Sequence, residues 1–241
     1  RAGSFGLNAG SPTRGSCADK PSGVDAGACK RFHSCRMMHP GPGSPSHDGP
    51  RVRGAQLITY PDSLGGSLSE LADLLDAGWG DLFPAGIHVL PPFPSSGDRG
   101  FAPLTYAEID PSFGTWSDLK RVAAHGGLLL DVMVNHISRR SEEFAAFEQH
   151  GRAAATADLF ITLEKVWPGN DPPAEDVRRI FLRKPGHPFS DIVIADTGAV
   201  ERIWTSFGPR IDWSEQIDLD FTSPSARDLI ARWFRGLAAN G

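Results

Sequence analysis

The segment Asp131-Val-Met-Val-Asn135-His136 combines a carboxylate, an amide and an imidazole directly after an apolar run. Its near-continuous apolar character predicts a strand over 128–134 that is covered on both faces. Asp131 and Asn135 would then point to the same side of that strand. Burial of the Asp131 carboxylate is costly unless it is paired. Two interpretations stay open: a site with Asn135 and His136 at its mouth, or a satisfied buried Asp131 beside a capping Asn-His pair.

A second candidate is the loop segment Asp98-Arg99-Gly100-Phe101-Ala102-Pro103. A carboxylate accepts hydrogen bonds from hydroxyl groups, and an aromatic face covers apolar C–H groups, so Asp98 and Phe101 suit a sugar. The alternative is an ordinary polar loop with one anchoring Phe. A third segment, Arg183-Lys184-Pro185-Gly186-His187-Pro188-Phe189, is basic with an aromatic end. It suits an anion such as phosphate, or it is a solvated basic loop.

These residues must be positioned by an alternation of strands and helices. The predicted strands cover 55–60, 86–90 and 128–134, and the predicted helices cover 67–78, 117–125, 141–151 and 224–239. Ser67 and Glu70 have the spacing of a capping box at the start of the first helix. For the last helix we expect Pro224 in the first turn and one buried stripe. That stripe consists of Leu229, Ile230, Trp233, Phe234 and Leu237.

The alternation predicts an α/β fold with a parallel sheet, either a barrel or an open doubly wound sheet. In both architectures the active site lies at the carboxyl ends of the strands, where the candidate loops lie. The stretch 162–214 is rich in Pro and Gly, and we expect it to be irregular. We therefore divide the chain into a low-complexity segment (1–53), a catalytic region (54–137 with 215–241) and an inserted excursion (138–214).

Charge and cysteine content set limits on function. The 241 residues have a net charge of −5, which argues against nucleic-acid binding, and they contain no apolar run long enough to span a membrane. Residues 1–53 hold 8 basic and 3 acidic side chains, with 9 Gly, 6 Pro and 7 Ser, and we expect them to be disordered. The order of Cys29, His33, Cys35 and His39 matches no usual zinc spacing. No cysteine follows Cys35, so we expect a cytoplasmic protein.

Taken in order, the segments resemble the α-amylase family of glycoside hydrolases, family 13, and within it the sucrose phosphorylase subfamily. The resemblance covers about 54–241. It rests on Gln56-Leu57-Ile58-Thr59-Tyr60, Gly86-Ile87-His88-Val89-Leu90-Pro91-Pro92-Phe93, Asp98-Arg99-Gly100-Phe101, 106–120, Asp131-Val-Met-Val-Asn135-His136, 184–189, 203–207 and Gln216-Ile217-Asp218-Leu219-Asp220. It implies the N-terminal part of a (β/α)8 TIM barrel with an inserted B domain.

The resemblance also implies site residues. Asp98 matches the residue that binds glucosyl hydroxyls, Phe101 the aromatic platform under the ring, and His136 a histidine that hydrogen-bonds the same sugar. Asp131 matches an aspartate that supports the site, and Phe189 matches an aromatic beside it. Asn135 matches a calcium ligand of many amylases and is here a supporting residue, because no complete oxygen cage is evident. We expect no metal and no cofactor.

The implied reaction transfers a glucosyl group from sucrose or a related α-glucoside to inorganic phosphate, with retention. It needs a nucleophile and an acid/base, which in the family follow strands four and five. Asp212, Asp218 and Asp220 lie before the last helix, in the wrong element, so we expect both groups beyond Gly241. This chain alone is then inactive. An α-glucoside hydrolase and a non-catalytic sugar-binding fragment stay open, as does the acceptor: fructose, fructose phosphate, glycerate or glycerol.

Overall fold

The computed structural model describes residues 54–181, 186–208 and 214–240. The expectations for residues 1–53, including the four Cys and His positions, lie outside the described residues. So do Arg183, Lys184 and Asp212. Among the described helices, none is both long enough and apolar enough to cross a membrane.

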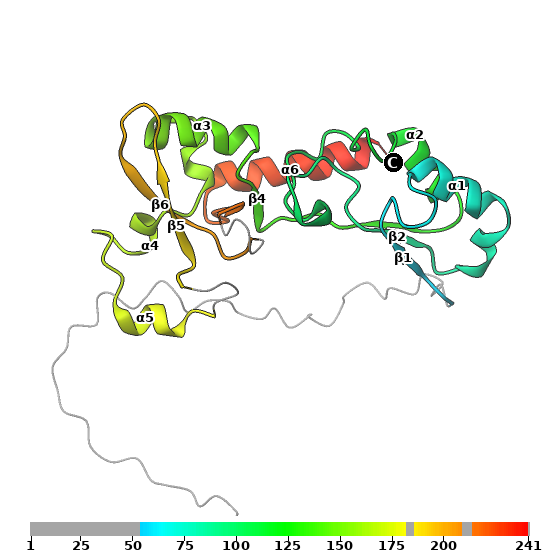
Figure 1. Ribbon diagram of the computed structural model, residues 1–241, viewed down its shortest axis with the longest axis horizontal. Coiled ribbons are helices and arrows are strands. Elements are labelled where there is room, and N and C mark those ends of the chain that lie inside the picture. The colour runs from blue at the N-terminus through cyan, green and yellow to red at the C-terminus, as the bar shows by residue number, and fades with distance from the viewer. Residues whose placement is uncertain (1–53, 182–185, 209–213, 241) are drawn as a thin grey trace, which may run out of the picture. The chain divides into compact units, whose positions relative to one another are not determined.

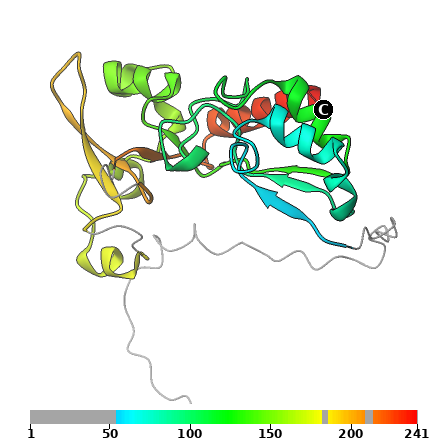
Figure 2. The same ribbon diagram turned by 45° about the vertical axis from the view of Figure 1, so that its right-hand side comes forward.

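A three-stranded parallel sheet holds the first half of the described chain together, with strand order β1 (Leu57–Thr59), β2 (Ile87–Val89), β3 (Leu128–Leu130). Helices α1 (Leu68–Asp76) and α2 (Trp116–Ala123) lie side by side on one face of it (Figure 2). A 3₁₀ turn, η1 (Trp79–Leu82), follows α1. These elements confirm the predicted parallel α/β order.

The two faces of this sheet differ in burial. Ile87 and Val89 are fully buried in a cluster with the apolar sides of α1 and α2. On the other face Ile58, His88 and Leu129 are in register across the three strands. There Ile58 is 59% and Leu129 45% exposed. The helices therefore cover only one side of the sheet.

Capping residues define where α1 and α2 begin. The Ser67 hydroxyl accepts a hydrogen bond from the Glu70 N–H, which is one half of the predicted capping box. A full capping box is present on α2, where the Thr115 side chain accepts from the Asp118 N–H and the Asp118 carboxylate accepts from the Thr115 N–H. The second helix therefore starts at Trp116, one residue before its predicted start.

The predicted strand over 128–134 is wrong in its second half, because β3 ends at Leu130. Residues 131–135 make no strand pairing in the structure. At Met133 the Tyr106 hydroxyl supplies the backbone hydrogen bonds in place of a strand. It accepts from the Met133 N–H at 2.7 Å and donates to the Met133 carbonyl at 3.3 Å. Asp131 and Asn135 are consequently not held on one face of a strand.

A second buried cluster is built on the antiparallel pair β4 (His136–Ser138) and β7 (Gln216–Asp218). It includes Phe144 and Phe147 from α3 (Glu142–His150), which stack at 5.6 Å. The stretch 162–214, predicted to be irregular, contains a hairpin of β5 (Phe189–Val193) and β6 (Val200–Trp204) (Figure 1). It also contains the short helices α4 (Leu163–Val166) and α5 (Ala174–Arg179). Three 3₁₀ turns elsewhere complete the described elements: η2 (Asp98–Gly100), η3 (Gly151–Ala153) and η4 (Ala157–Leu159).

The last helix, α6 (Pro224–Ala239), has the predicted start, with Ser223 as N-cap and Pro224 in the first turn. Leu229 is buried as predicted, and Trp233 packs against both buried clusters. Phe234 was expected on the buried stripe, but it is 50% exposed. The helix therefore buries a narrower stripe than its apolar residues indicate.

Gly86 and Gly78 provide a matched test of the β2–β3 approach. Both have a positive φ, 99° for Gly86 and 105° for Gly78. A Cβ on Gly86 would lie 2.1 Å from the Gly127 carbonyl oxygen, which accepts a hydrogen bond from the Ile87 N–H. A Cβ on Gly78 would meet nothing within 4 Å. We expect Gly78→Ala to lower the free energy of unfolding by about 1–2 kcal/mol and Gly86→Ala by more than about 3 kcal/mol. Urea unfolding measures both, and equal losses would contradict the close approach.

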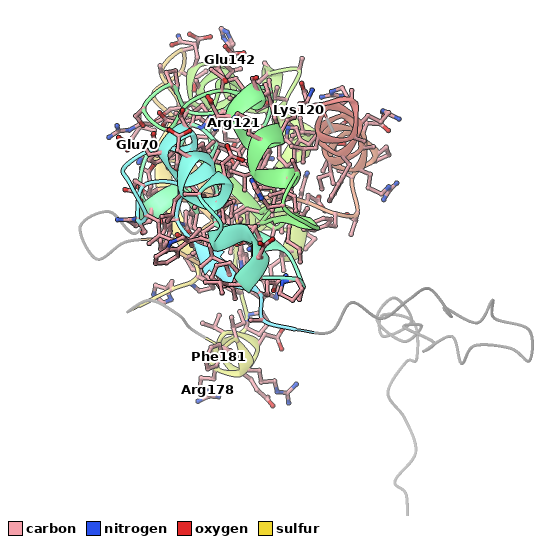
Figure 3. All side chains as sticks on the ribbon, turned by 90° about the vertical axis from the view of Figure 1, so that its right-hand side faces the viewer. Glu70, Lys120, Arg121, Glu142, Arg178 and Phe181 are labelled. Carbon is pink, nitrogen blue, oxygen red and sulfur yellow. The ribbon has the colours of Figure 1, made fainter. Side chains whose placement is uncertain are left out.

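Asp76 predicts a pH dependence of the α1–α2 contact. Hydrogen bonds from Arg121 and then His125 lower the pKa of Asp76, and Arg121 projects from α2 beside α1 (Figure 3). A carboxylate with a lowered pKa stabilises the fold above its unfolded value of about 4, and this contribution is lost as the pH falls. We expect Asp76→Asn to destabilise at pH 7 and to unfold like the unmodified chain near pH 2. Urea unfolding at both pH values tests this, with exposed Asp191→Asn as control.

Candidate functional site

The carboxyl ends of the parallel strands meet at one edge of the sheet, and the chain after β2 forms a closed loop there. Residues 95–103, here called the 95–103 loop, are fastened at their base by the bridge between Ser95 and Pro103. The Ser95 hydroxyl lies 2.8 Å from the Ala102 carbonyl and 2.7 Å from the Gly97 carbonyl. Its tip contains η2 and Phe101. The loop that carries both predicted sugar-contacting residues is thus an ordered structural unit.

His136 joins this loop to β4. Its Nε2 lies 2.7 Å from the Phe101 carbonyl oxygen, and its Nδ1 lies 2.8 Å from the Asn135 amide nitrogen. A carbonyl can only accept, so Nε2 carries the proton and Nδ1 accepts from Asn135. The ring is 5% exposed, and its centroid lies 5.4 Å from that of Phe207. The structure therefore brings Phe101, Asn135 and His136 together.

Asp131 has the partner that its position demands. The His88 Nε2 on β2 lies 3.2 Å from the Asp131 Oδ1, and the two side chains are 20% and 32% exposed. The sequence indicates that a buried Asp131 needs a partner, but not which residue supplies it. Only the parallel register, which places His88 beside β3, reveals the pair.

Of the two other predicted site residues, Asp98 shares the 95–103 loop with Phe101, and Phe189 lies on the β5–β6 hairpin. The backbone of Asp98 begins η2, and its side chain lies outside the described portion of the structure. Phe189 opens β5, half-buried, with its ring 5.0 Å from that of His187 and 6.5 Å from that of Trp204. Both residues keep their proposed roles from the sequence resemblance alone.

Two further contacts of the 95–103 loop were not predicted. The Glu215 carboxylate, 6% exposed, accepts hydrogen bonds from the Ser96 and Ser138 hydroxyls, at 3.2 Å for Ser138. On the loop tip Arg99 forms an ion pair with Asp62 at 2.7 Å and lies 4.1 Å above the Tyr60 ring. Each contact joins segments far apart in the chain, so no local spacing could have indicated it.

Asp218 and Asp220, which precede α6, both accept hydrogen bonds from neighbouring groups. The Asp218 Oδ2 accepts from the Ser206 N–H at 2.6 Å. Burial acts to raise the pKa of Asp220, but hydrogen bonds from Thr222 and Lys165 outweigh it and lower that pKa. Within the described ranges, no three His, Cys, Asp or Glu side chains gather as they would around a metal ion.

The fold is the N-terminal portion of a (β/α)8 barrel of the kind found in glycoside hydrolase family 13. No protein-family profile matches the chain. It is 52% identical over 180 residues to the sucrose 6(F)-phosphate phosphorylase of Thermoanaerobacterium thermosaccharolyticum, covering 75% of this chain and 36% of that protein. It is 44% identical over 192 residues to the sucrose phosphorylase of Streptococcus mutans, covering 80% of this chain and 38% of that protein.

The solved structures agree with the sequence comparison. The crystal structure of sucrose 6F-phosphate phosphorylase from Thermoanaerobacter thermosaccharolyticum superimposes with a TM-score of 0.76 at 49% identity, covering 80% of this chain and 39% of that one. The chain belongs to the sucrose phosphorylase subfamily of the α-amylase family. It spans less than two fifths of the length of these relatives.

Tyr106 provides a test of how the segment between Asp131 and Asn135 is held. Its ring is 2% exposed and packs against Phe93 at 4.9 Å and Trp233 at 5.0 Å, and burial raises the pKa of its hydroxyl. Tyr106→Phe removes both hydrogen bonds to Met133, and we expect a loss of about 1–3 kcal/mol in the free energy of unfolding. Urea unfolding measures it, with Tyr60→Phe as the matched control. A loss no larger than in the control would show that Met133 does not depend on this hydroxyl.

Proposed function

We propose that this chain carries the glucosyl-binding portion of a retaining α-glucosyl transferase that phosphorolyses sucrose or a related α-glucoside to glucose 1-phosphate. Its substrates are the glucoside and inorganic phosphate. The observation that carries the proposal is the joint arrangement of Phe101, Asn135 and His136 in a chain 52% identical to a sucrose 6(F)-phosphate phosphorylase. The cytoplasmic location expected from the cysteine distribution belongs to the same proposal.

The residues have complementary tasks in this proposal. Asp98 accepts hydrogen bonds from the glucosyl hydroxyls, and Phe101 covers an apolar face of the ring. His136 contacts the same sugar when one of its ring nitrogens exchanges its protein partner for a hydroxyl. Phe189 lines the neighbouring position. Asp131, paired with His88, and Asn135, bonded to His136, support the site from beneath.

Retaining transfer requires two carboxyl groups about 5–5.5 Å apart, one as nucleophile and one as acid/base. Asp218 and Asp220 are each engaged by backbone or side-chain donors of the fold, which supports a structural task for both. We propose that neither catalytic group is among these 241 residues, and that the chain by itself binds glucose without turning over a glucoside.

The proposal includes a division of the chain into a low-complexity segment (1–53), a barrel region (54–137 with 215–241) and a B domain (138–214). One buried cluster supports the barrel region, because all its buried residues come from 68–122, with β2, α1 and α2 among its elements. The other cluster joins the two regions, because it combines α3 and the β5–β6 hairpin with the β4–β7 pair and the start of α6. Trp233 on α6 is packed against both.

Incubation of the full chain with phosphate and either sucrose or sucrose 6F-phosphate tests the proposal. We expect no glucose 1-phosphate and no free glucose. We expect weak glucose binding by saturation-transfer NMR, in the millimolar range or above and lost in Asp98→Ala. Asp191→Ala, an exposed aspartate on β5, is the matched control. Formation of glucose 1-phosphate would contradict the assignment of the catalytic groups, free glucose would favour a hydrolase, and glucose binding unaffected by Asp98→Ala would contradict the site.

A further inference from the structure

The 95–103 loop is closed at its base by hydrogen bonds between its two ends, and it is also held from outside at Ser96 and at Arg99. At the base, the Ser96 N–H donates to the Ala102 carbonyl at 3.1 Å and the Leu104 N–H donates to the Pro94 carbonyl at 2.8 Å. At the tip, Gly100 has φ 98°, and a Cβ there would lie 2.7 Å from the Pro91 carbonyl oxygen. The tip therefore folds back tightly over the residues that follow β2.

One outside contact runs from Arg99 to the loop after β1. Arg99 is a non-glycine residue in the left-handed region, with φ 52° and ψ 42°. This conformation is unfavourable for a residue with a Cβ. Its guanidinium pairs with Asp62 at 2.7 Å and covers the Tyr60 ring at 4.1 Å. The side chains of Arg99 and Asp62 are 56% and 35% exposed, so solvent screens the pair and it adds little to global stability.

The other outside contact runs from Ser96 to the β4–β7 pair. Ser96 and Ser138 share the buried Glu215 carboxylate, and their two hydroxyl oxygens lie 2.6 Å apart. The Ser138 hydroxyl oxygen also accepts from the Arg140 N–H at 2.8 Å. Ser138 is fully buried. This contact therefore anchors the start of the loop to a rigid, desolvated point.

We propose that Arg99 and Glu215 are positioning residues that hold the 95–103 loop, with Asp98 and Phe101 on it, in its sugar-binding form before the sugar arrives. The inference rests on the function proposed above and names the groups that prepare its site. A loop ordered in advance loses less conformational entropy on binding. The strained Arg99 backbone and the buried Glu215 carboxylate then serve ligand affinity rather than folding.

Arg99→Gly removes the side-chain contacts without adding backbone strain, because glycine adopts the left-handed conformation freely. Arg99→Lys retains the charge and serves as the rescue. Glu215→Gln removes the charge of the second anchor while keeping an oxygen acceptor, and Ser96→Ala takes its place if the glutamine variant does not fold. Arg202→Ala is the matched control, since Arg202 forms a comparably exposed ion pair with Asp191 on the hairpin.

Three measurements on the full chain decide the inference: amide hydrogen exchange over 96–102, urea unfolding, and glucose affinity by NMR. In Arg99→Gly and in Glu215→Gln or Ser96→Ala we expect exchange in the tip to rise roughly tenfold and glucose affinity to fall about threefold or more. The urea midpoint of Arg99→Gly stays at that of Arg202→Ala, and Arg99→Lys restores part of the protection.

Unchanged tip exchange in Arg99→Gly and in the Glu215 or Ser96 variant would overturn the inference. So would faster exchange that is matched by an equal loss of global stability, because that result indicates a purely structural role. If the unmodified chain binds no glucose, the proposed function fails, while the exchange comparison still decides whether the two residues order the loop. The two proposals therefore fail in distinguishable ways.

Discussion

The carbonyl oxygen of Phe101 is the point on which the described site depends. It accepts from His136 on β4 and from the Gln216 side chain on β7, at 2.7 and 3.4 Å. Through it the loop after β2 is bound to the antiparallel pair that also begins the second buried cluster. Because a carbonyl offers only acceptor sites, it also fixes the tautomer of His136 and hence the direction of the Asn135 amide. One backbone group thereby determines the orientation of two side chains and the path of one loop.

Much of the fold follows from local sequence. The apolar spacing of α1 and α2 and the Gly-rich stops after them gave the right order of strands and helices, and Pro224 marked the start of α6. The sequence-based predictions are wrong where contacts between residues far apart in the chain determine the structure. β3 ends at Leu130 because the Tyr106 hydroxyl, and not a neighbouring strand, hydrogen-bonds the backbone at Met133. No local sequence pattern indicates this contact. The β5–β6 hairpin forms in a Pro- and Gly-rich stretch because Ile192 and Ile203 reach a core made by α3.

The candidate site divides in the same way. The cost of burying Asp131 predicts a partner for it, but only the strand register shows that this partner is His88. Phe101 and His136 were singled out by residue type and by resemblance, but their mutual contact runs through a backbone atom and leaves no trace in side-chain identity. Glu215 lies 119 residues from Ser96 and was not recognised at all, since an isolated glutamate before a short strand resembles any surface residue. Sequence thus indicates which chemistry is present, and packing decides which groups hold it in place.

His88 has a wider consequence through its place between Ile58 and Leu129. In a (β/α)8 barrel the sheet face turned away from the helices lines the interior, which is filled mostly by branched apolar side chains. Here that face carries an imidazole in its middle strand, and this imidazole reaches the carboxylate just above it. A residue of the face that lines the barrel interior is therefore in direct contact with Asp131, a candidate supporting residue of the site. A change of size or polarity on this face would therefore reach the candidate site through the contact between His88 and Asp131.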